Sequence, residues 1–275
     1  MMAYLTGMKT KFLFFAIIIA VCICAWTAGP ARAGELTVAA AADLTFAFKD
    51  AAAKFQQKTG NPVRVSYGSS GNFFSQIKNG APYDIFFSAD VDYPRKLEAA
   101  GLTEPGSIYE YAAGRIVIWV PSTSRLVIDR GLQVLLDPDI HKIAIANPQH
   151  APYGRAAVAA MRHAGVYDQV KNKLVLGENI SQTAQFVSSG NADVGIVALS
   201  LAVAPAMKAK GRYFEIPSGD YPPIIQAAVI LKSAHNQDGA RRFLNFLKDP
   251  SGVALMESYG FSLPKEVAGS GNPPN

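Results

Sequence analysis

The sequence predicts an α/β fold of two lobes, in which mainly parallel sheets are flanked by helices. Short runs rich in β-branched and small apolar residues alternate with segments of helical periodicity along nearly the whole chain. Such alternation sets parallel strands side by side, with the connecting helices on both faces of a sheet. The roughly 240 residues after the N-terminal segment suffice for two hydrophobic cores, and no Pro/Gly/Ser-rich linker divides them. Two lobes joined by strands fit these observations, and a single undivided sheet is the alternative.

The first part of this region contains three strand–helix pairs. In the first helix, Leu44, Ala47 and Phe48 recur at helical spacing, and Gly60-Asn61-Pro62 ends the pattern. The predicted strands are residues 36–40, 63–67 and 84–88. The predicted helices are residues 43–58, 72–78 and 93–100, and residues 68–71 are predicted to form a turn.

The rest of the chain continues the same alternation. Pro121 ends an apolar strand, and Pro152 stands just before a helix, where proline is favoured. The predicted strands are residues 115–120, 142–146, 173–176, 192–197 and 225–231. The predicted helices are residues 131–136, 153–163, 181–189, 239–247 and 251–258, and residues 265–275 are predicted to form a flexible tail.

The first 33 residues have the three parts of a secretory signal peptide. Lys9 and Lys11 form a positive region, residues 12–26 form an uncharged apolar run, and Ala31-Arg32-Ala33 matches a small-x-small cleavage site. The run of roughly 15 residues is shorter than the ~20 needed to span a bilayer, so a membrane anchor is the weaker alternative. We therefore expect this segment to be cleaved and the mature chain to be periplasmic.

Charge and cysteine content exclude several functional classes. Without the signal peptide, 23 basic and 21 acidic residues remain, a net charge of +2 with no cluster of Lys and Arg. Nucleic-acid binding needs a larger basic footprint, so we predict no nucleic-acid partner. Cys22 and Cys24 both lie in the apolar run, and neither follows the small residue that a lipid anchor requires. The mature chain therefore has no disulfide, thiolate metal site or cysteine nucleophile.

Small and polar residues gather where predicted strands lead into predicted helices. In open α/β sheets, ligands bind beyond the carboxyl ends of the strands, and helix N-termini there present free N–H groups and a favourable dipole. Such neutral donors favour a small oxyanion, whereas a fixed cation would bind many anions indiscriminately and would cost desolvation. The four junctions of this kind are residues 41–43, 68–71, 148–154 and 178–181.

Each junction also has an ordinary structural interpretation. Ser69 and Ser70 are typical helix caps and turn residues, and Asp43 is a typical N-cap. Residues 152–154 are a typical helix start. One such junction is therefore weak support for a binding site, but four at equivalent topological positions carry more weight.

Enzyme motifs are absent from the sequence. None of the four histidines has zinc-site spacing, and there is no nucleophile elbow, phosphate-binding loop or dinucleotide fingerprint. We therefore predict no catalytic residue, no cofactor and no site for a free metal cation. A hydrolase or transferase on a similar α/β scaffold is the alternative, which would need a base within reach of Ser69 or Ser70; His150 is the candidate.

Six segments, in order along nearly the whole mature chain, share their pattern with a known family. The most specific is Gly80-Ala-Pro-Tyr-Asp-Ile-Phe-Phe-Ser-Ala-Asp90, and the others are residues 36–45, 65–70, 145–154, 193–197 and 259–261. The chain resembles the periplasmic molybdate-binding proteins of ABC importers. This resemblance implies a type II periplasmic-binding-protein fold, with lobe 1 formed by residues 34–113 and 225–264 and lobe 2 by residues 114–224.

The resemblance also implies a ligand and a site. In that family, molybdate or tungstate lies between the lobes without a counter-ion and accepts hydrogen bonds from two serines, two backbone amides and a tyrosine. Here the serine sites fall on Asp43 and Ser70, the backbone donors on Tyr153 and Ile180, and the tyrosine site on Ala198, with Ser69 adjoining. The family further implies a monomer that delivers its ligand to an inner-membrane ABC permease after the lobes close.

Two of these positions depart from the family pattern. Ala198 lacks a hydroxyl, which Ser200 or Tyr153 could replace. Asp43 is the larger departure, because a carboxylate ~4 Å from a negative charge costs roughly 4 kcal/mol at an effective dielectric constant of ~20. Three interpretations stay open: Asp43 turns away as an N-cap, it is protonated, or the solute is a protonated oxyanion, a metal cation or a small organic molecule.

Overall fold

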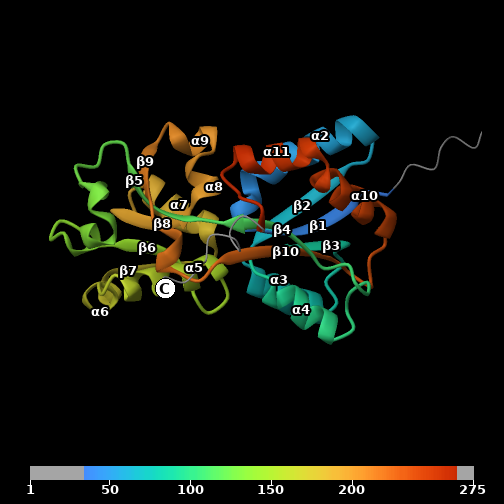
Figure 1. The fold of residues 1–275 in the computed structure, drawn as a ribbon, viewed down its shortest axis with the longest axis horizontal. Helices are drawn as coiled ribbons and strands as arrows, with labels where there is room; N and C mark the ends of the chain where they lie inside the picture. Colours follow the sequence, from blue (N-terminus) through green and yellow to red (C-terminus); the bar gives the residue numbers. More distant parts are fainter. Residues whose placement is uncertain (1–33, 265–275) are drawn as a thin grey trace, which may run out of the picture. The chain divides into compact units, whose positions relative to one another are not determined.

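The computed structural model describes residues 34–264, so the predicted signal peptide and C-terminal tail lie outside the described residues. The strands of this range form two five-stranded sheets, each flanked by helices (Figure 1). We call each sheet with its helices a lobe. This architecture confirms the predicted α/β fold of two lobes. Within residues 34–264, no helix is long and apolar enough to cross a membrane.

Lobe 1 contains the sheet with strand order β2-β1-β3-β10-β4, in which β10 is antiparallel to both its neighbours and β1 is parallel to β2 and β3. Its strands are β1 (Leu36–Ala41), β2 (Val63–Gly68), β3 (Ile85–Ser88), β4 (Tyr109–Gly114) and β10 (Ile224–Ile230). Its helices are η1 (Ala42–Leu44), α2 (Thr45–Thr59), α3 (Ser70–Lys78), α4 (Asp92–Ala99), α10 (Gln237–Lys248) and α11 (Pro250–Ser258).

Lobe 2 repeats this plan with the order β7-β6-β8-β5-β9, in which β5 is antiparallel to both its neighbours. Its strands are β5 (Ile116–Pro121), β6 (Ile143–Ala146), β7 (Leu174–Gly177), β8 (Val194–Ala198) and β9 (Gly211–Glu215). Its helices are η2 (Ile128–Leu136), α5 (Pro152–His163), α6 (Tyr167–Val170), η3 (Lys171–Lys173), α7 (Ile180–Ser188), α8 (Leu199–Ala202), α9 (Pro205–Lys208) and η4 (Ser218–Asp220).

The core of each lobe follows the side-chain alternation of its strands. In β1, Leu36, Val38 and Ala40 pack with residues of α2 and α10, whereas Ala39 packs with residues of α3 on the opposite face. In lobe 2, Ile116, Val117, Ile118 and Trp119 are all fully buried, because helices cover both faces of β5. Each sheet is therefore held in place from both sides.

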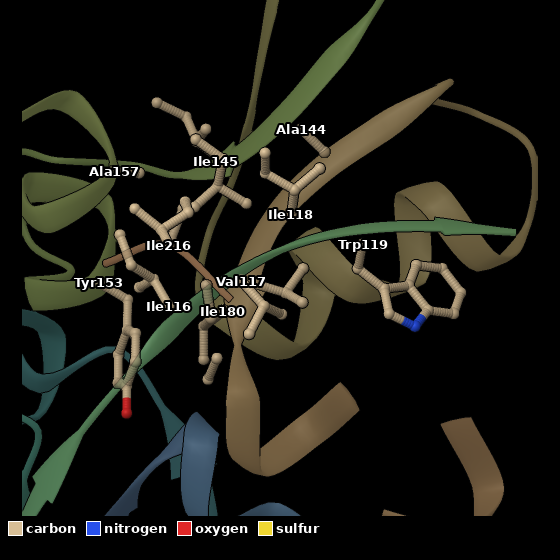
Figure 2. Packing of buried hydrophobic residues seen from close by; sticks show 14 of the residues in the cluster. Ile116, Val117, Ile118, Trp119, Ala144, Ile145, Tyr153, Ala157, Ile180 and Ile216 are labelled. Atoms are coloured by element: carbon tan, nitrogen blue, oxygen red, sulfur yellow. The ribbon is translucent and has the colours of Figure 1, made fainter. Parts of the chain in front are cut away.

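The apolar cluster of lobe 2 also fixes one residue that faces the other lobe. Figure 2 shows the ring of Tyr153 among the aliphatic side chains of this cluster, with its hydroxyl pointing away from them. Tyr153 is only 2% exposed. The phenol ring thus holds its hydroxyl at the boundary of lobe 2.

The chain passes between the lobes twice within the described residues, from β4 to β5 and from β9 to β10. The sequence pattern does not predict β4 or β9. Half of β4 is Ala112, Ala113 and Gly114, which have weak strand propensity, and β9 is a largely exposed edge strand without an apolar run. Both strands form because they pair with the buried strands β10 and β5.

Candidate functional site

The strand ends of both lobes meet at a small, partly open cleft with a cavity volume of about 10 Å³. This is less than the ~300–1,000 Å³ typical of pockets for drug-sized ligands. Five of the six predicted site residues line it, and Ala198 does not. The lining residues are Ala89 and eleven residues from the four predicted junctions: Ala41, Ala42, Asp43, Gly68, Ser69, Ser70, Ala151, Pro152, Tyr153, Asn179 and Ile180.

Three helix N-termini converge on this cleft. The first turns of α3, α5 and α7 contain Ser70, Tyr153 and Ile180, respectively. In a first turn the backbone N–H groups have no acceptor within their own helix, because no earlier turn supplies a carbonyl. The side chains of Ser69 and Asn179 cap α3 and α7. Each accepts the N–H group of the residue three positions later in the chain. The caps therefore leave the first N–H group of each helix available to an anion.

The predicted turn over residues 68–71 is wrong in its extent, because α3 already begins at Ser70. The Ser69 hydroxyl accepts the N–H of Asn72 at 3.4 Å, which fixes the start of the helix two residues earlier than predicted. The Ser70 hydroxyl oxygen accepts the N–H of Ala89 at 2.9 Å. That bond orients the hydroxyl and leaves its proton for donation.

Asp43 is not an N-cap, so that structural interpretation is wrong. It lies within η1, whose N-terminus has no side-chain cap. Its Oδ2 instead accepts hydrogen bonds from the hydroxyl of Tyr153 at 3.0 Å and from Nε2 of Gln226 at 2.7 Å. Its Oδ1 is buried and has no hydrogen-bond partner among the described residues.

Burial dominates the ionisation of Asp43. The side chain is 1% exposed, and desolvation raises its pKa from 3.8 to about 6, against the opposing effect of the bonds from Gln226 and Tyr153. Burial, together with the charge of Asp43, also raises the pKa of Tyr153 well above its ordinary value, so this phenol stays protonated and donates. The carboxyl group thus lies in a site that disfavours its charge.

Sequence reasoning missed two residues of this arrangement. Gln226 donates from Nε2 to Asp43 and to the Tyr153 hydroxyl at 2.9 Å, and its Oε1 accepts from the hydroxyl of Tyr111 at 2.6 Å. We call these four residues the carboxyl network. The available signal was a single amide in the apolar run of β10, since a fully buried amide needs partners.

The position of the expected tyrosine site lies outside the cleft lining. Ala198 is fully buried at the end of β8 and precedes α8. Two residues later, the hydroxyl of Ser200 donates to the backbone carbonyl of Asp43 at 2.8 Å. The two hydroxyls considered as replacements, those of Ser200 and Tyr153, therefore both bind Asp43.

A second group of contacts joins the lobes at the edge of the cleft. His150 Nδ1 lies 2.9 Å from the Ser69 hydroxyl oxygen, and His150 Nε2 lies 3.7 Å from a carboxylate oxygen of Glu178. Asn72 donates its side-chain N–H to Glu178, and Gly71 donates its backbone N–H to the carbonyl of His150 at 2.9 Å. We call these five residues the rim contacts. They supply the base beside Ser69 that the hydrolase alternative requires.

The cleft lining contains no Lys, Arg or His side chain. Within residues 34–264, no group of three or more His, Cys, Asp or Glu side chains could hold a metal ion. The ion pair of Arg155 in lobe 2 with Asp90 in lobe 1, at 2.5 Å, involves no lining residue. The cleft therefore offers neutral donors and a single carboxyl group.

A family model for bacterial extracellular solute-binding proteins matches residues 36–262. The chain belongs to this family. It is 41% identical to the molybdate-binding protein ModA of Rhodobacter capsulatus over 84% of this chain and 90% of that protein. The sequence-based resemblance to molybdate-binding proteins is thereby confirmed.

Solved structures agree with this assignment. The periplasmic molybdate-binding protein of Azotobacter vinelandii matches with a TM-score of 0.79 and 38% identity, over 83% of this chain and 99% of that chain. The substrate-binding domain of a putative molybdenum ABC transporter from Clostridium difficile matches with a TM-score of 0.63 and 28% identity, over 83% and 98% of the two chains. The relatives are solute-binding proteins.

Proposed function

We propose that this protein is the periplasmic solute-binding component of an ABC importer and captures molybdate or tungstate between its lobes. The observation that carries the proposal is the convergence of three helix N-termini on a small cleft without a cationic side chain. Such a cleft binds a compact anion through neutral donors. The names of the relatives identify molybdate as the oxyanion.

The expected donors come from both lobes. From lobe 1, Ser70 donates its hydroxyl and backbone N–H, with Ser69 beside it. From lobe 2, Tyr153 and Ile180 donate backbone N–H groups. Asp43 completes the lining next to them. Because donors from both lobes meet one anion, binding favours the closed arrangement of the lobes.

Export, delivery and stoichiometry complete the proposal. The mature protein is a periplasmic monomer released by signal-peptide cleavage, and its closed form delivers the oxyanion to an inner-membrane permease. It needs no cofactor, since the oxyanion is cargo. The relative described as part of a molybdenum ABC transporter supports this role.

Isothermal titration of the mature protein with molybdate, tungstate, sulfate and phosphate tests the proposal. We expect heat of binding with molybdate and tungstate at micromolar protein. Ser70→Ala removes one charge-assisted hydrogen bond and lowers the affinity roughly tenfold to a hundredfold. Ser75→Ala, at an exposed position of the same helix, is the matched control and keeps the affinity. No heat with any oxyanion would refute the function.

The contact of His150 with Ser69 is the one observation that favours a hydrolase. Ser69 is only 4% exposed and its hydroxyl oxygen also caps α3, so it is poorly placed to attack a substrate. We propose that this contact holds the lobes together and has no catalytic role. Hydrolysis of a chromogenic ester by the protein, abolished in Ser69→Ala, would show the opposite.

A further inference from the structure

The carboxyl group of Asp43 is the only acidic group among the residues that line the cleft. The groups around it are hydrogen-bond donors: backbone N–H groups at three helix N-termini and the hydroxyl of Ser70. An ionised carboxylate can only accept, so it would repel an oxyanion bound by those donors. A protonated carboxyl group, in contrast, donates one hydrogen bond and carries no charge.

The carboxyl network determines which oxygen of Asp43 can carry that proton. Oδ2 accepts from Tyr153 and from Gln226, so both of its lone-pair directions are in use. Oδ1 is fully buried without a partner among the described residues, although Asp43 lines the cleft. A proton on Oδ1 therefore leaves both existing bonds intact and makes Oδ1 a free donor beside the ligand.

We propose that Asp43 binds the oxyanion in its protonated form, donating from Oδ1, and that oxyanion capture is consequently coupled to the uptake of one proton. This inference rests on the proposed function and specifies how the same site recognises its ligand. It also resolves the conflict between an ionised carboxylate and a dianion, whose like charges repel each other in a buried site.

The surroundings of Asp43 support a neutral carboxyl group. From α5 and β10, Tyr153 and Gln226 contact the carboxyl group, and Tyr111 of β4 lies behind Gln226. Burial raises the pKa of each of these two tyrosines well above the ordinary value of a phenol, so both remain uncharged donors. Asp90 acts on Tyr111 as a further negative charge.

The other elements packed against η1 bring no compensating cation. The hydroxyls of Thr45 in α2 and Ser181 in α7 bind the carbonyl of Ala42, and Ser200 in α8 binds the carbonyl of Asp43. Within residues 34–264, no Lys, Arg or His stabilises the charge of Asp43. The pKa of Asp43, about 6, rises further when a dianion binds beside it, and this rise sets the direction of the coupling.

This coupling has a consequence for selectivity. The free N–H groups, the Ser70 hydroxyl and a protonated Asp43 all donate, and together they favour oxyanions whose oxygens all accept, such as molybdate and tungstate. Hydrogen phosphate carries an O–H that would meet only donors. We therefore expect phosphate to be rejected while Asp43 is protonated.

Titration calorimetry with molybdate measures the coupling directly. Binding at pH 7.5 is recorded in buffers of different ionisation enthalpy, and the slope of the observed enthalpy gives the number of protons taken up. We expect about one proton per molybdate, and an affinity that falls by up to tenfold per pH unit above about pH 6. Phosphate at pH 6 should give no heat.

Variants assign the proton to Asp43. Asp43→Asn keeps the shape of the side chain and replaces the carboxyl group by an amide, whose NH₂ always donates. We therefore expect binding without proton uptake and without this pH dependence. Asp43→Ser provides a second variant with the same expectation. Asp50→Asn is the matched control, because exposed Asp50 also accepts a tyrosine hydroxyl, that of Tyr259 at 2.7 Å. It should retain the proton uptake of the unmodified protein.

The outcomes separate the two proposals. Molybdate binding with no proton uptake and a flat pH profile would overturn the coupling while leaving the function intact. Proton uptake that persists in Asp43→Asn and disappears in Asp90→Asn would also overturn it, by assigning the proton to the other carboxyl group near the network. Absence of molybdate binding at every pH would refute the function itself.

Discussion

The carboxyl network and the rim contacts both join the two lobes, but they do so in different surroundings. In the carboxyl network, Asp43 is 1% exposed and its partners are neutral hydroxyl and amide groups. At the rim, the side chains of His150 and Glu178 are 20% and 55% exposed, and both partners can carry charge. Bringing the lobes together thus places one ionisable group in the interior, whereas His150 and Glu178, both of lobe 2, meet lobe 1 near water.

This difference predicts which region controls the energetics of closure. Water and salt screen charges at the rim, so an exposed ion pair contributes only about 0–1 kcal/mol. In the interior, the cost of an unfavourable charge is not screened, and the loss of one bond to it costs about 1.5–3 kcal/mol. We therefore expect pH to act mainly through the carboxyl network and salt mainly through the rim contacts.

The largest expected effect is the pH dependence of stability that Asp43 imposes. Because burial raises its pKa from 3.8 to about 6, its contribution to the free energy of unfolding is fully present below pH 3.8 and is lost as pH rises through 6. The loss amounts to about 3 kcal/mol. Urea unfolding of the ligand-free protein at several pH values should show this decline, and Asp43→Asn should lack it. Parallel curves for the two proteins would contradict the buried placement of Asp43.

Tyr153→Phe tests the same region by removing a hydroxyl that bonds across the lobes. Removing the hydroxyl deprives Asp43 Oδ2 of one of its two donors. At pH 8, where the carboxyl group is ionised, the free energy of unfolding should fall by about 2 kcal/mol, and at pH 5 by about half of that. Tyr259→Phe, which removes an exposed tyrosine–aspartate bond, should lose less than 1 kcal/mol at either pH. Equal losses in the two variants would show that burial does not strengthen the bond at Tyr153.

Periodicity alone predicted most of the fold, because strands buried on both faces and helices with one apolar face leave clear patterns. It also located the junctions that line the cleft, since helix N-termini after parallel strands are visible in the sequence. The partners of Asp43 could not be predicted in this way. Gln226, in β10, is 183 residues away from Asp43 along the chain, and no local pattern joins them.

The same limit explains the error over Asp43. An acidic residue just before a helical pattern is statistically an N-cap, and local sequence carries no information on the donors that approach from lobe 2. Tyr153 donates to the side chain of Asp43, and Ser200 donates to its backbone carbonyl. Residues at a boundary between two lobes are therefore the ones that sequence patterns describe least well.

Gly71→Ala should affect closure more than folding. A Cβ at this position would lie 2.6 Å from the Tyr93 hydroxyl and 2.8 Å from the carbonyl oxygen of His150, so the lobes could not approach as closely. Alanine is also the better helix former, which offsets any loss of stability in α3. We expect the free energy of molybdate binding to weaken by about 1–2 kcal/mol with no fall in ligand-free stability. Gly219→Ala, which meets open space, should change neither; an equal loss of affinity there would contradict the steric argument.

Glu178→Gln should have the smallest effect, and its dependence on salt is the informative part. The substitution removes the charge that faces His150 at 3.7 Å, while the amide oxygen can still accept from Asn72. Because the Glu178 side chain is 55% exposed, we expect a loss of less than 1 kcal/mol in the free energy of molybdate binding, and a smaller one at high salt. Titrations at low and high ionic strength, compared with Asp43→Asn, measure this. A loss from Glu178→Gln that exceeds that of Tyr153→Phe and persists in salt would place the energetic control of closure at the rim, and would reverse the contrast between the two regions.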